Sequence, residues 1–254
     1  MNIQGQAAIV TGGASGLGAQ TARELAKRGA KVAVFDRNAE GAKAVAAEIG
    51  GIGVGCDITS SESVIAALAA AREAHGPARL LMNIAGIGTA KRLIGKDGTP
   101  MPLEDFKRVI DVNLIGTFNV TRLAVAEMVK LEPLNDGERG VVVNTASVAA
   151  FDGQVGQEAY AASKGGLVSL TLPLARDLAQ FGVRAVTIAP GLFLTPLMHQ
   201  LPEPVRAALA ASVPFPKRLG KPEEFAHLAL AIVENITLNG EVIRLDGALR
   251  MAPR

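Results

Sequence analysis

The sequence predicts an α/β protein with one domain, residues 1–254, built on a seven-stranded parallel sheet with helices on both faces. Short apolar segments alternate with longer helical segments along most of the chain, which is typical of a doubly wound sheet. A glycine-rich turn separates the first apolar segment from the first helical one. Apolar residues make up 49% of the chain, which is enough for a substantial buried core.

The composition argues against several functional classes. The formal net charge is only +2 and no basic block stands out, so we expect no nucleic-acid partner and no membrane-surface role. Cys56 is the only cysteine, which excludes an intrachain disulfide and a multi-cysteine metal site, and we expect no metal. No apolar run reaches membrane-spanning length, and an apolar strand begins by Ala7, which leaves no room for a signal peptide. We therefore expect a soluble cytoplasmic protein.

The first strand, residues 7–11, leads into the glycine-rich turn 11–18 and then into a helix over residues 19–28. Such a turn lets the backbone approach a pyrophosphate, which then sits on the helix N-terminus. Tight turns of other kinds also need glycine, but here a strand precedes the turn and a helix follows it. This arrangement predicts a dinucleotide-binding site.

The second strand, residues 31–35, ends in Asp36. An acidic side chain there can accept hydrogen bonds from an adenosine ribose and would repel a 2′-phosphate, which favours NAD over NADP. Arg37 argues in the other direction, because an arginine at this point can neutralise a phosphate. The alternative interpretation is that Asp36 only serves the N-terminus of the next helix, residues 39–49.

Asp57 follows the third strand, residues 52–56. Its carboxylate either meets the adenine edge of the cofactor or caps the next helix, residues 62–75, and both interpretations remain open here. The fourth strand, residues 79–82, continues the alternation of strand and helix that implies a parallel sheet.

The loop 89–101 breaks this alternation because it is polar and contains two glycines and a proline. It also carries Lys91, Arg92 and Lys96. The loop is either a solvated surface segment or a cationic rim that meets an anionic substrate.

The pattern of residues 103–131 predicts two helices or one long bent helix in this stretch, with Asn113 near the middle. An asparagine in an apolar helical stretch costs stability unless its amide is hydrogen-bonded. The fifth strand, residues 140–144, is a continuous apolar run of the kind found in central parallel strands, and Ser147 follows it. Ser147 is therefore expected at the carboxyl end of the sheet, where such folds bind ligands.

Tyr160 is the only tyrosine of the chain, and Lys164 follows it at i+4 on a predicted helix that runs to about residue 181. Both side chains then leave the same face of the helix. A phenol normally loses its proton at about pH 10, and a nearby ammonium lowers that pKa. The pair is a candidate general acid/base, and the hydroxyl of Ser147 can converge on the same substrate oxygen. The alternative is a core tyrosine beside a solvated lysine.

The sixth strand, residues 184–189, precedes the proline-rich segment 192–220, which predicts a mobile substrate lid with one or two short helices. A helix over residues 222–234 and a seventh strand over residues 241–245 complete the predicted sheet.

Several motifs follow one another in a familiar order: T-G-x-x-x-G-x-G from Thr11, N-x-A-G from Asn83, the helical Asn113, Ser147, Y-x-x-x-K from Tyr160, and P-G from Pro190. In this order and spacing the chain resembles the short-chain dehydrogenase/reductase family over nearly its whole length. Ile84 is a small departure, since the family often has a second Asn or an Ala there. The resemblance implies a Rossmann-type domain, hydride transfer with NAD, and a homotetramer that pairs the Asn113 and Tyr160 helices between subunits.

The resemblance also implies roles for single residues. Tyr160 exchanges a proton with the substrate oxygen, Lys164 lowers the pKa of the phenol and holds the nicotinamide ribose, and Ser147 donates a hydrogen bond to the substrate oxygen. Asn113 holds a relay water. The implied cofactor-binding residues are Gly12, Ser15, Gly16, Leu17, Gly18, Asp36, Asp57, Asn83, Ala85, Gly86, Tyr160, Lys164, Pro190, Gly191 and Thr195.

Residues 111–121, 144–151, 189–193 and 238–247 carry a narrower resemblance, to the short-chain 3-hydroxyacyl-CoA dehydrogenases, also known as 17β-hydroxysteroid dehydrogenases. It implies that the chain interconverts 3-hydroxyacyl-CoA and 3-ketoacyl-CoA, and it places the loop 89–101 where that branch has an insertion near the acyl-CoA.

Two other functions are considered. One is an NAD-dependent dehydrogenase of hydroxysteroids or other secondary alcohols, because an apolar lid admits many substrates. The other is a nucleotide-binding scaffold or sensor without turnover, although such relatives commonly lose the Tyr or the Lys that this chain keeps.

Overall fold

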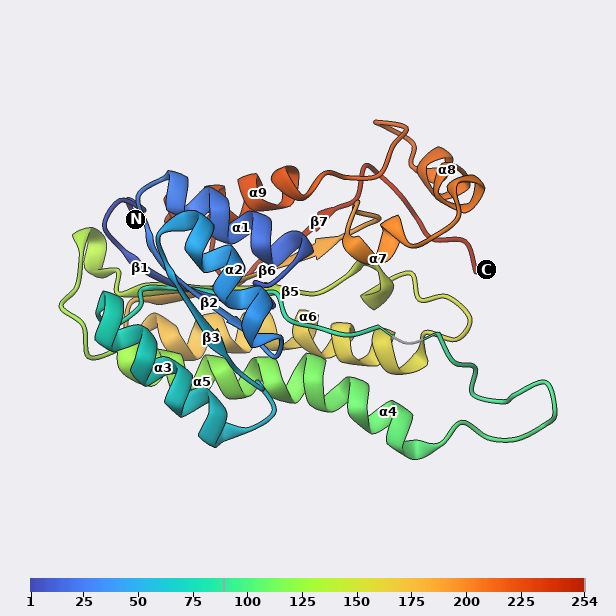
Figure 1. Ribbon diagram of the computed structural model, residues 1–254, viewed down its shortest axis with the longest axis horizontal. Coiled ribbons are helices and arrows are strands. Elements are labelled where there is room, and N and C mark those ends of the chain that lie inside the picture. The colour runs from blue at the N-terminus through green and yellow to red at the C-terminus, as the bar shows by residue number, and fades with distance from the viewer. Residues whose placement is uncertain (89, 254) are drawn as a thin grey trace.

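The computed structural model describes residues 1–88 and 90–253, so Thr89, the first residue of the predicted loop 89–101, and Arg254 lie outside the described residues. Seven parallel strands form one sheet in the order β3-β2-β1-β4-β5-β6-β7 (Figure 1). The strands are β1 Ala7–Thr11, β2 Lys31–Asp36, β3 Ile52–Gly55, β4 Leu80–Asn83, β5 Gly140–Thr145, β6 Val183–Pro190 and β7 Val242–Leu245. The predicted fold class is confirmed, and each predicted strand end moves by at most one residue.

The helices are α1 Gly16–Lys27, α2 Ala39–Ile49, α3 Ser61–His75, α4 Leu103–Ile110, α5 Thr117–Met128, α6 Glu158–Ala179, α7 Pro196–His199, α8 Glu203–Ser212 and α9 Pro222–Glu234, of which α7 and α8 lie beside the sheet rather than on it. A π-helical segment, η1 Asp111–Gly116, joins α4 to α5. Two short 3-10 turns are η2 Asn135–Gly137 and η3 Val148–Ala150.

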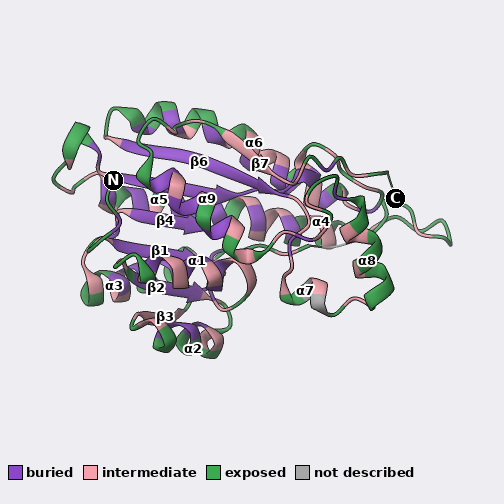
Figure 2. Ribbon diagram, turned by 90° about the horizontal axis from the view of Figure 1, so that it is seen from above, coloured by how far each residue is buried: buried purple, intermediate pink, exposed green. Residues whose placement is uncertain are grey.

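The core lies on both faces of the sheet because successive side chains of a strand point to opposite sides. In β1, Ala8 and Val10 pack with residues of α1, α2 and α9, whereas Ala7 and Ile9 pack with residues of α3 and α5. Figure 2 shows most of the strands as buried, while α8 and the loop beyond α4 are largely exposed. The strand order reverses between β1 and β4, which places a crevice at the carboxyl ends of these two strands.

One long helix occupies Leu103–Met128, where the sequence predicts two helices or one bent helix. The π-helical segment in its middle carries Asn113. By length and composition alone this helix could cross a membrane, although polar residues interrupt its apolar sequence. Half of its most apolar window is buried within the protein, and the helix packs against α3 and α6, so its apolar side chains contribute to the core.

The two irregular segments differ in how they are held. The described part of the predicted loop, residues 90–101, reaches out past α4 and closes through a bridge between Ile94 and Pro100 (Figure 1). Lys91 of this loop forms an ion pair with Asp105 of α4. The segment 192–220 carries α7 and α8, as the prediction of one or two short helices requires, and none of the α8 residues is buried.

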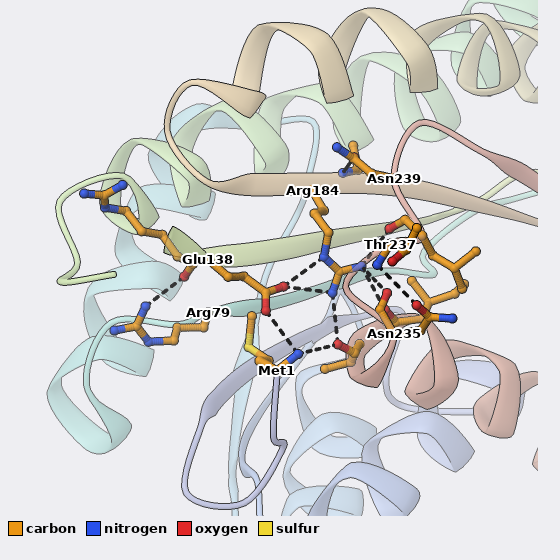
Figure 3. A network of polar contacts seen from close by, with 12 residues as sticks. Met1, Arg79, Glu138, Arg184, Asn235, Thr237 and Asn239 are labelled. Carbon is orange, nitrogen blue, oxygen red and sulfur yellow. Dashed lines mark hydrogen bonds and ion pairs between the residues drawn. The ribbon is translucent and has the colours of Figure 1, made fainter. Parts of the chain in front are cut away.

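A buried ionic network closes the end of the sheet where β5 and β6 begin (Figure 3). Arg184 of β6 is 5% exposed and Glu138 is 4% exposed, and the guanidinium donates to Glu138 Oε1 over 2.9 Å. Its other donors reach four main-chain oxygens, those of Ile232, Val233, Asn235 and Leu238. The ammonium of Met1 lies 3.1 Å from Glu138 Oε2 and donates to the carbonyl of Val233 over 2.8 Å.

Candidate active site

A cavity of about 1300 Å³ opens at the carboxyl end of the sheet. It runs from the glycine-rich turn after β1, past the ends of β2, β4 and β5, to the lid segment. Fifteen of the predicted site residues line it: Gly12, Ser15, Gly16, Leu17, Gly18, Asp36, Asp57, Ala85, Gly86, Ser147, Tyr160, Lys164, Pro190, Gly191 and Thr195. Residues far apart in the sequence therefore meet in one site, as the prediction requires.

The glycine-rich turn brings the N-terminus of α1 to the cavity wall. Ser15 occupies the N-cap position of α1, so the first amides of the helix face the cavity end of the turn. Gly12 has φ +68°, a conformation that favours glycine. A Cβ on Gly18 would lie 2.1 Å from the carbonyl oxygen of Gly12, so only glycine lets the helix approach the turn this closely. These contacts make a backbone cradle that fits a pyrophosphate.

Asp36 points from the end of β2 toward this cradle. Its Oδ2 accepts a hydrogen bond from the amide of Ala14 over 3.1 Å, and its Oδ1 accepts one from the amide of Asn38 over 2.9 Å. Asn38, and not Asp36, caps α2 by accepting from the amide of Gly41. The alternative in which Asp36 only serves that helix is therefore wrong. Arg37 also lines the cavity.

Asp57 lies beyond β3 at the same side of the cavity. Its Oδ1 accepts from the amide of Thr59 over 2.9 Å and from the hydroxyl of Thr59 over 2.7 Å. The hydrogen bonds from Thr59 hold the pKa of this carboxyl below its usual range. Ser60 caps α3, so the alternative in which Asp57 caps that helix is wrong.

Tyr160, Lys164 and Ser147 meet at the inner end of the cavity. The ammonium of Lys164 lies 5.8 Å from the centroid of the Tyr160 ring and donates to the carbonyl of Thr145 over 2.7 Å. Ser147 and Tyr160 both line this end of the cavity, so their hydroxyls can converge on one substrate oxygen. The interpretation of Tyr160 as a core tyrosine beside a solvated lysine is wrong, because Lys164 is only 3% exposed and both line the cavity.

The pKa of Tyr160 differs from the expectation. Burial raises the pKa of this phenol, and the neighbouring hydroxyl of Ser147 opposes that shift without cancelling it. Burial also lowers the pKa of Lys164 to about 8. The sequence predicts that Lys164 lowers the pKa of the phenol. In the structure desolvation of the phenol dominates, and the ammonium donates to the carbonyl of Thr145.

Asn113 is fully buried behind the cavity wall rather than in it. Its Oδ1 accepts from the amide of Ile87, and its Nδ2 donates to the carbonyl of Ile87 and to Ser163 Oγ over 2.8 and 3.0 Å. The amide is therefore satisfied, as an asparagine inside a helix requires. Gly86 separates it from Lys164: a Cβ on Gly86 would lie 3.2 Å from Asn113 Oδ1 and 3.3 Å from Lys164 Nζ.

Asn83 does not reach the cavity, although the sequence assigns it to cofactor binding. Its Nδ2 donates to Thr121 Oγ1 and to Asn144 Oδ1, both over 2.9 Å. Its side chain thus joins β4 to β5 and α5 beneath the site. Three buried polar atoms in this region lack a hydrogen-bond partner among the described residues: Oδ1 of Asn83, Nδ2 of Asn144 and Oγ1 of Thr145.

Sequence reasoning missed part of the lining. Thr145, Gln157 and Met251 line the cavity, and Met251 comes from the C-terminal segment beyond β7. Met251 has no motif around it, and only the path of the chain after β7 brings it to the site. In the described part of the chain, no group of three or more His, Cys, Asp or Glu side chains is placed to hold a metal ion.

Comparisons with known proteins agree with this geometry. A family model described as short chain dehydrogenase matches residues 6–206. The human protein named 3-hydroxyacyl-CoA dehydrogenase type-2 is 54% identical over 255 residues, which cover 99% of this chain and 98% of the relative. The Drosophila melanogaster protein of the same name is 54% identical over 254 residues, 99% of this chain and 100% of the relative.

Two solved structures have the same fold over nearly the whole chain. The crystal structure of 3-hydroxyacyl-CoA dehydrogenase type-2 from Mycobacterium avium superposes with a TM-score of 0.93 at 45% identity, covering 98% of each chain. The crystal structure of 3-ketoacyl-(acyl-carrier-protein) reductase from Brucella melitensis complexed with NADH has a TM-score of 0.87 at 32% identity and covers 98% of this chain and 100% of that one.

Proposed function

Because the chain belongs to the short-chain dehydrogenase family and is an oxidoreductase that uses a nicotinamide cofactor, we propose that it interconverts 3-hydroxyacyl-CoA and 3-ketoacyl-CoA with NAD. One observation carries the proposal. The side chains of Ser147, Tyr160 and Lys164 line the same cavity as the glycine-rich turn, in a chain that is 54% identical to relatives named for this activity.

The lining residues fit a nicotinamide dinucleotide. The backbone cradle from Gly12 to Gly18 suits the pyrophosphate, Asp36 the adenosine ribose, and Asp57 the adenine edge. Ala85, Gly86, Pro190, Gly191 and Thr195 continue the wall toward Tyr160 and Lys164 and would hold the nicotinamide half. When bound, the cofactor supplies the carbon that accepts or gives the hydride.

The side chains of the protein handle the proton and the orientation. Tyr160 takes the proton of the substrate hydroxyl during oxidation and returns it to the carbonyl oxygen during reduction. Ser147 donates a hydrogen bond to the same oxygen and holds it in place. Lys164, fixed by the carbonyl of Thr145, places a positive charge where the phenolate forms and binds the nicotinamide ribose.

Asn113 completes this assignment as a positioning residue. Both donors of its amide are used within the protein, and Oδ1 accepts from Ile87. An amide oxygen has a second lone pair, and Oδ1 of Asn113 and Nζ of Lys164 both lie next to Gly86. A water molecule held there would link Lys164 to solvent as a proton relay.

Asp36 supports the choice of NAD over NADP. The amides of Ala14 and Asn38 fix both carboxylate oxygens, and a remaining lone pair on each can accept from a ribose hydroxyl. Asp36→Ala is expected to reduce the ratio of kcat/KM with NAD to that with NADP at least about tenfold, since one charge-assisted interaction is lost. Asp57→Ala is the matched control and should weaken both cofactors alike. An unchanged ratio of the two kcat/KM values in Asp36→Ala would show that this carboxylate does not bind the adenosine ribose.

The test of the reaction is the initial rate of NADH formation with short and medium 3-hydroxyacyl-CoAs, beside a steroid alcohol and with NADP as control. We expect turnover of the acyl-CoAs with NAD. If only the steroid or simple secondary alcohols are turned over, the assignment to the dehydrogenase family stands and the assignment of 3-hydroxyacyl-CoA as substrate is overturned. Binding of NAD without turnover of any substrate would favour a nucleotide sensor.

We further propose a cytoplasmic homotetramer. Ile115 and Phe118 on the long helix and Leu172 on α6 are between 45% and 50% exposed, which supports a covered face along these helices. Sedimentation of the purified protein tests this, and a monomeric mass at micromolar concentration would contradict it. The buried, single Cys56 suits a reducing compartment, and cell fractionation tests the location.

A further inference from the structure

One side chain fastens the loop between Ser147 and Tyr160 to the edge of the sheet. Arg244 belongs to β7, and all three nitrogens of its guanidinium donate hydrogen bonds. Nη1 and Nη2 donate to the two carboxylate oxygens of Asp152 over 3.2 and 2.5 Å, and Nε donates to Asp246 Oδ2 over 2.7 Å. The guanidinium therefore joins the loop that precedes α6 to the turn that follows β7.

On one side this contact leads to Ser147. The Oγ of Ser147 accepts a hydrogen bond from the amide of Ala149 over 3.1 Å, which uses a lone pair of the oxygen and not its proton. Ala149 belongs to the turn η3, and the amide of Asp152 closes that turn on the carbonyl of Val148 over 2.8 Å. By holding the carboxylate of Asp152, the guanidinium fixes the turn that orients the Ser147 hydroxyl.

On the other side the contact leads to the cavity wall around Gly191. A Cβ on Gly191 would lie 2.8 Å from Cβ of Asp246, so Asp246 packs directly behind this glycine. The amide of Gly191 donates to the carbonyl of Leu245 over 2.9 Å. Asp246 Oδ1 accepts from the amide of Ala248 over 3.0 Å, which fixes the carboxylate in the turn after β7. Arg244 thus contacts the supports of two separate walls of the cavity.

The surroundings of the guanidinium make this link rigid. The side chains of Arg244, Asp152 and Asp246 are at most 20% exposed, and the ring centroid of Phe151 lies 5.1 Å from the guanidinium carbon. The hydrogen bonds from Arg244 hold the pKa of the Asp152 carboxyl below its usual range. A two-pronged arginine–carboxylate pair fixes geometry as well as charge, which lysine cannot do because its ammonium has no planar fork.

We propose that Arg244 is a positioning residue that sets the spacing between Ser147 and the nicotinamide. The inference rests on the proposed function, in which Ser147 holds the substrate oxygen and the wall around Gly191 holds the nicotinamide half of the cofactor. Ser147 and Gly191 line the cavity, whereas Arg244 is not among the described residues of the lining, so it acts through these two walls. Hydride transfer needs the two reacting carbons in near contact, and an error of about 1 Å can cost about 100-fold in rate.

The test changes the fork and keeps the charge. Arg244→Lys is expected to lower the single-turnover rate of NADH formation from 3-hydroxybutyryl-CoA, measured with enzyme in excess over substrate, at least about tenfold. The Kd of NAD should stay within about twofold of the wild-type value, because the glycine-rich turn and Asp36 bind the other half of the cofactor.

The partner of the guanidinium gives a second set of variants. Asp152→Asn should act as Arg244→Lys does, and Asp152→Glu, which keeps the carboxylate, should stay closer to the wild type. The double variant Arg244→Lys with Asp152→Asn should be no slower than the slower of the two single variants, because both changes remove one contact.

Two control variants separate positioning from stability. Arg23→Lys changes an arginine that binds Glu48 through Nε and Nη2 on the surface between α1 and α2, and it should leave the rate within about twofold. Glu138→Gln weakens the network at the opposite end of β5 and should lower stability, while the rate of the folded enzyme stays near that of the wild type. Thermal melting of every variant checks that it is folded.

The outcomes separate this inference from the proposed function. If Arg244→Lys and Asp152→Asn melt at lower temperature but the folded enzymes keep the wild-type single-turnover rate, Arg244 only stabilises the fold and the inference is overturned. A loss of NAD affinity at an unchanged rate overturns it too. If the wild type oxidises only another alcohol, the substrate assignment falls, and the same variants are compared with that alcohol. If the wild type oxidises no alcohol, the proposed function and the inference both fail.

Discussion

The two ends of the sheet each bury a cation but pair it differently. Where β5 and β6 begin, Arg184 donates hydrogen bonds to one carboxylate and four carbonyl oxygens. At the carboxyl end of β5, Lys164 donates to one carbonyl oxygen among the described residues. At the Arg184 end a second cation, the ammonium of Met1, pairs with the other carboxylate oxygen of Glu138. The second end has three of the four unpartnered buried polar atoms found in the described chain.

The difference shows how one sheet divides its tasks. A buried charge whose donors are all paired holds segments together, here the N-terminus, the start of two strands and the end of α9. A buried charge whose hydrogen-bond donors are not all paired costs stability, but its free donors can bind a ligand. Substitutions at the two ends should therefore have different effects: those at the network lower stability and leave the chemistry unchanged, whereas those at the cavity abolish the chemistry and leave stability unchanged or raise it.

The largest effect is expected at the cavity end. Tyr160→Phe removes the proton donor and acceptor and should lower kcat about 10³-fold, within the range of general acid–base catalysis. The affinity for NADH and the free energy of unfolding should change little, because the ring still fills its place. Initial rates, NADH titration and urea unfolding measure the three quantities. Turnover near the wild-type rate would exclude Tyr160 as the acid/base.

At the network end, Glu138→Gln is expected to lower the free energy of unfolding by about 3–5 kcal/mol, because Arg184 and the ammonium of Met1 both lose their anion. The kcat of the folded fraction should stay close to that of the wild type. Glu234→Gln is the matched control: its carboxylate pairs with Arg28 over 2.7 Å on the surface, and its loss should cost less than about 1 kcal/mol. Equal losses in both variants would contradict the comparison.

A smaller effect of opposite sign is expected for Lys164→Met. Burial lowers the pKa of Lys164 from 10.5 to about 8, so between these values the unfolded chain binds a proton that the folded chain does not, and stability rises with pH. Below about pH 8 both states carry the charge and its full burial cost is present. The variant should therefore be more stable at pH 7 by up to about 3 kcal/mol, while it loses activity.

The gain in Lys164→Met should shrink as the pH rises and vanish above about pH 10.5, where the lysine is neutral in both states. Urea unfolding between pH 7 and pH 10 measures this. Lys130→Met, an exposed lysine on the surface, serves as control and should show no such trend. A destabilised Lys164→Met at pH 7 would mean that the hydrogen bond to Thr145 outweighs the cost of burying the charge.

The cavity end was largely predictable because its parts are motifs with a strong local cause. The glycines of the turn after β1 are required by backbone contacts such as that between Gly18 and Gly12, and Asp36 and Ser147 follow strands whose carboxyl ends must meet. The strand ends themselves follow from short apolar runs. A pattern of residue types is enough where the cause lies within a few residues of the chain.

Other features depend on contacts that only the folded chain makes. The π-helical segment around Asn113, the placement of Met251 at the site and the position of Asn83 outside the cavity arise from packing between distant segments. The direction of the pKa shift of Tyr160 depends on how deeply the ring is buried, which no spacing of residues reveals. The network around Arg184 went unpredicted for the same reason, since its acceptors are mostly main-chain carbonyls.

The position of the only tyrosine has a practical consequence, because the chain contains no tryptophan. Tyr160 is then the sole source of phenolic absorbance and of tyrosine fluorescence, and it lies inside the reaction centre. The protein thus carries a built-in optical reporter: ionisation of this ring can be followed directly in the unmodified enzyme, without labelling and without background from other chromophores of its kind.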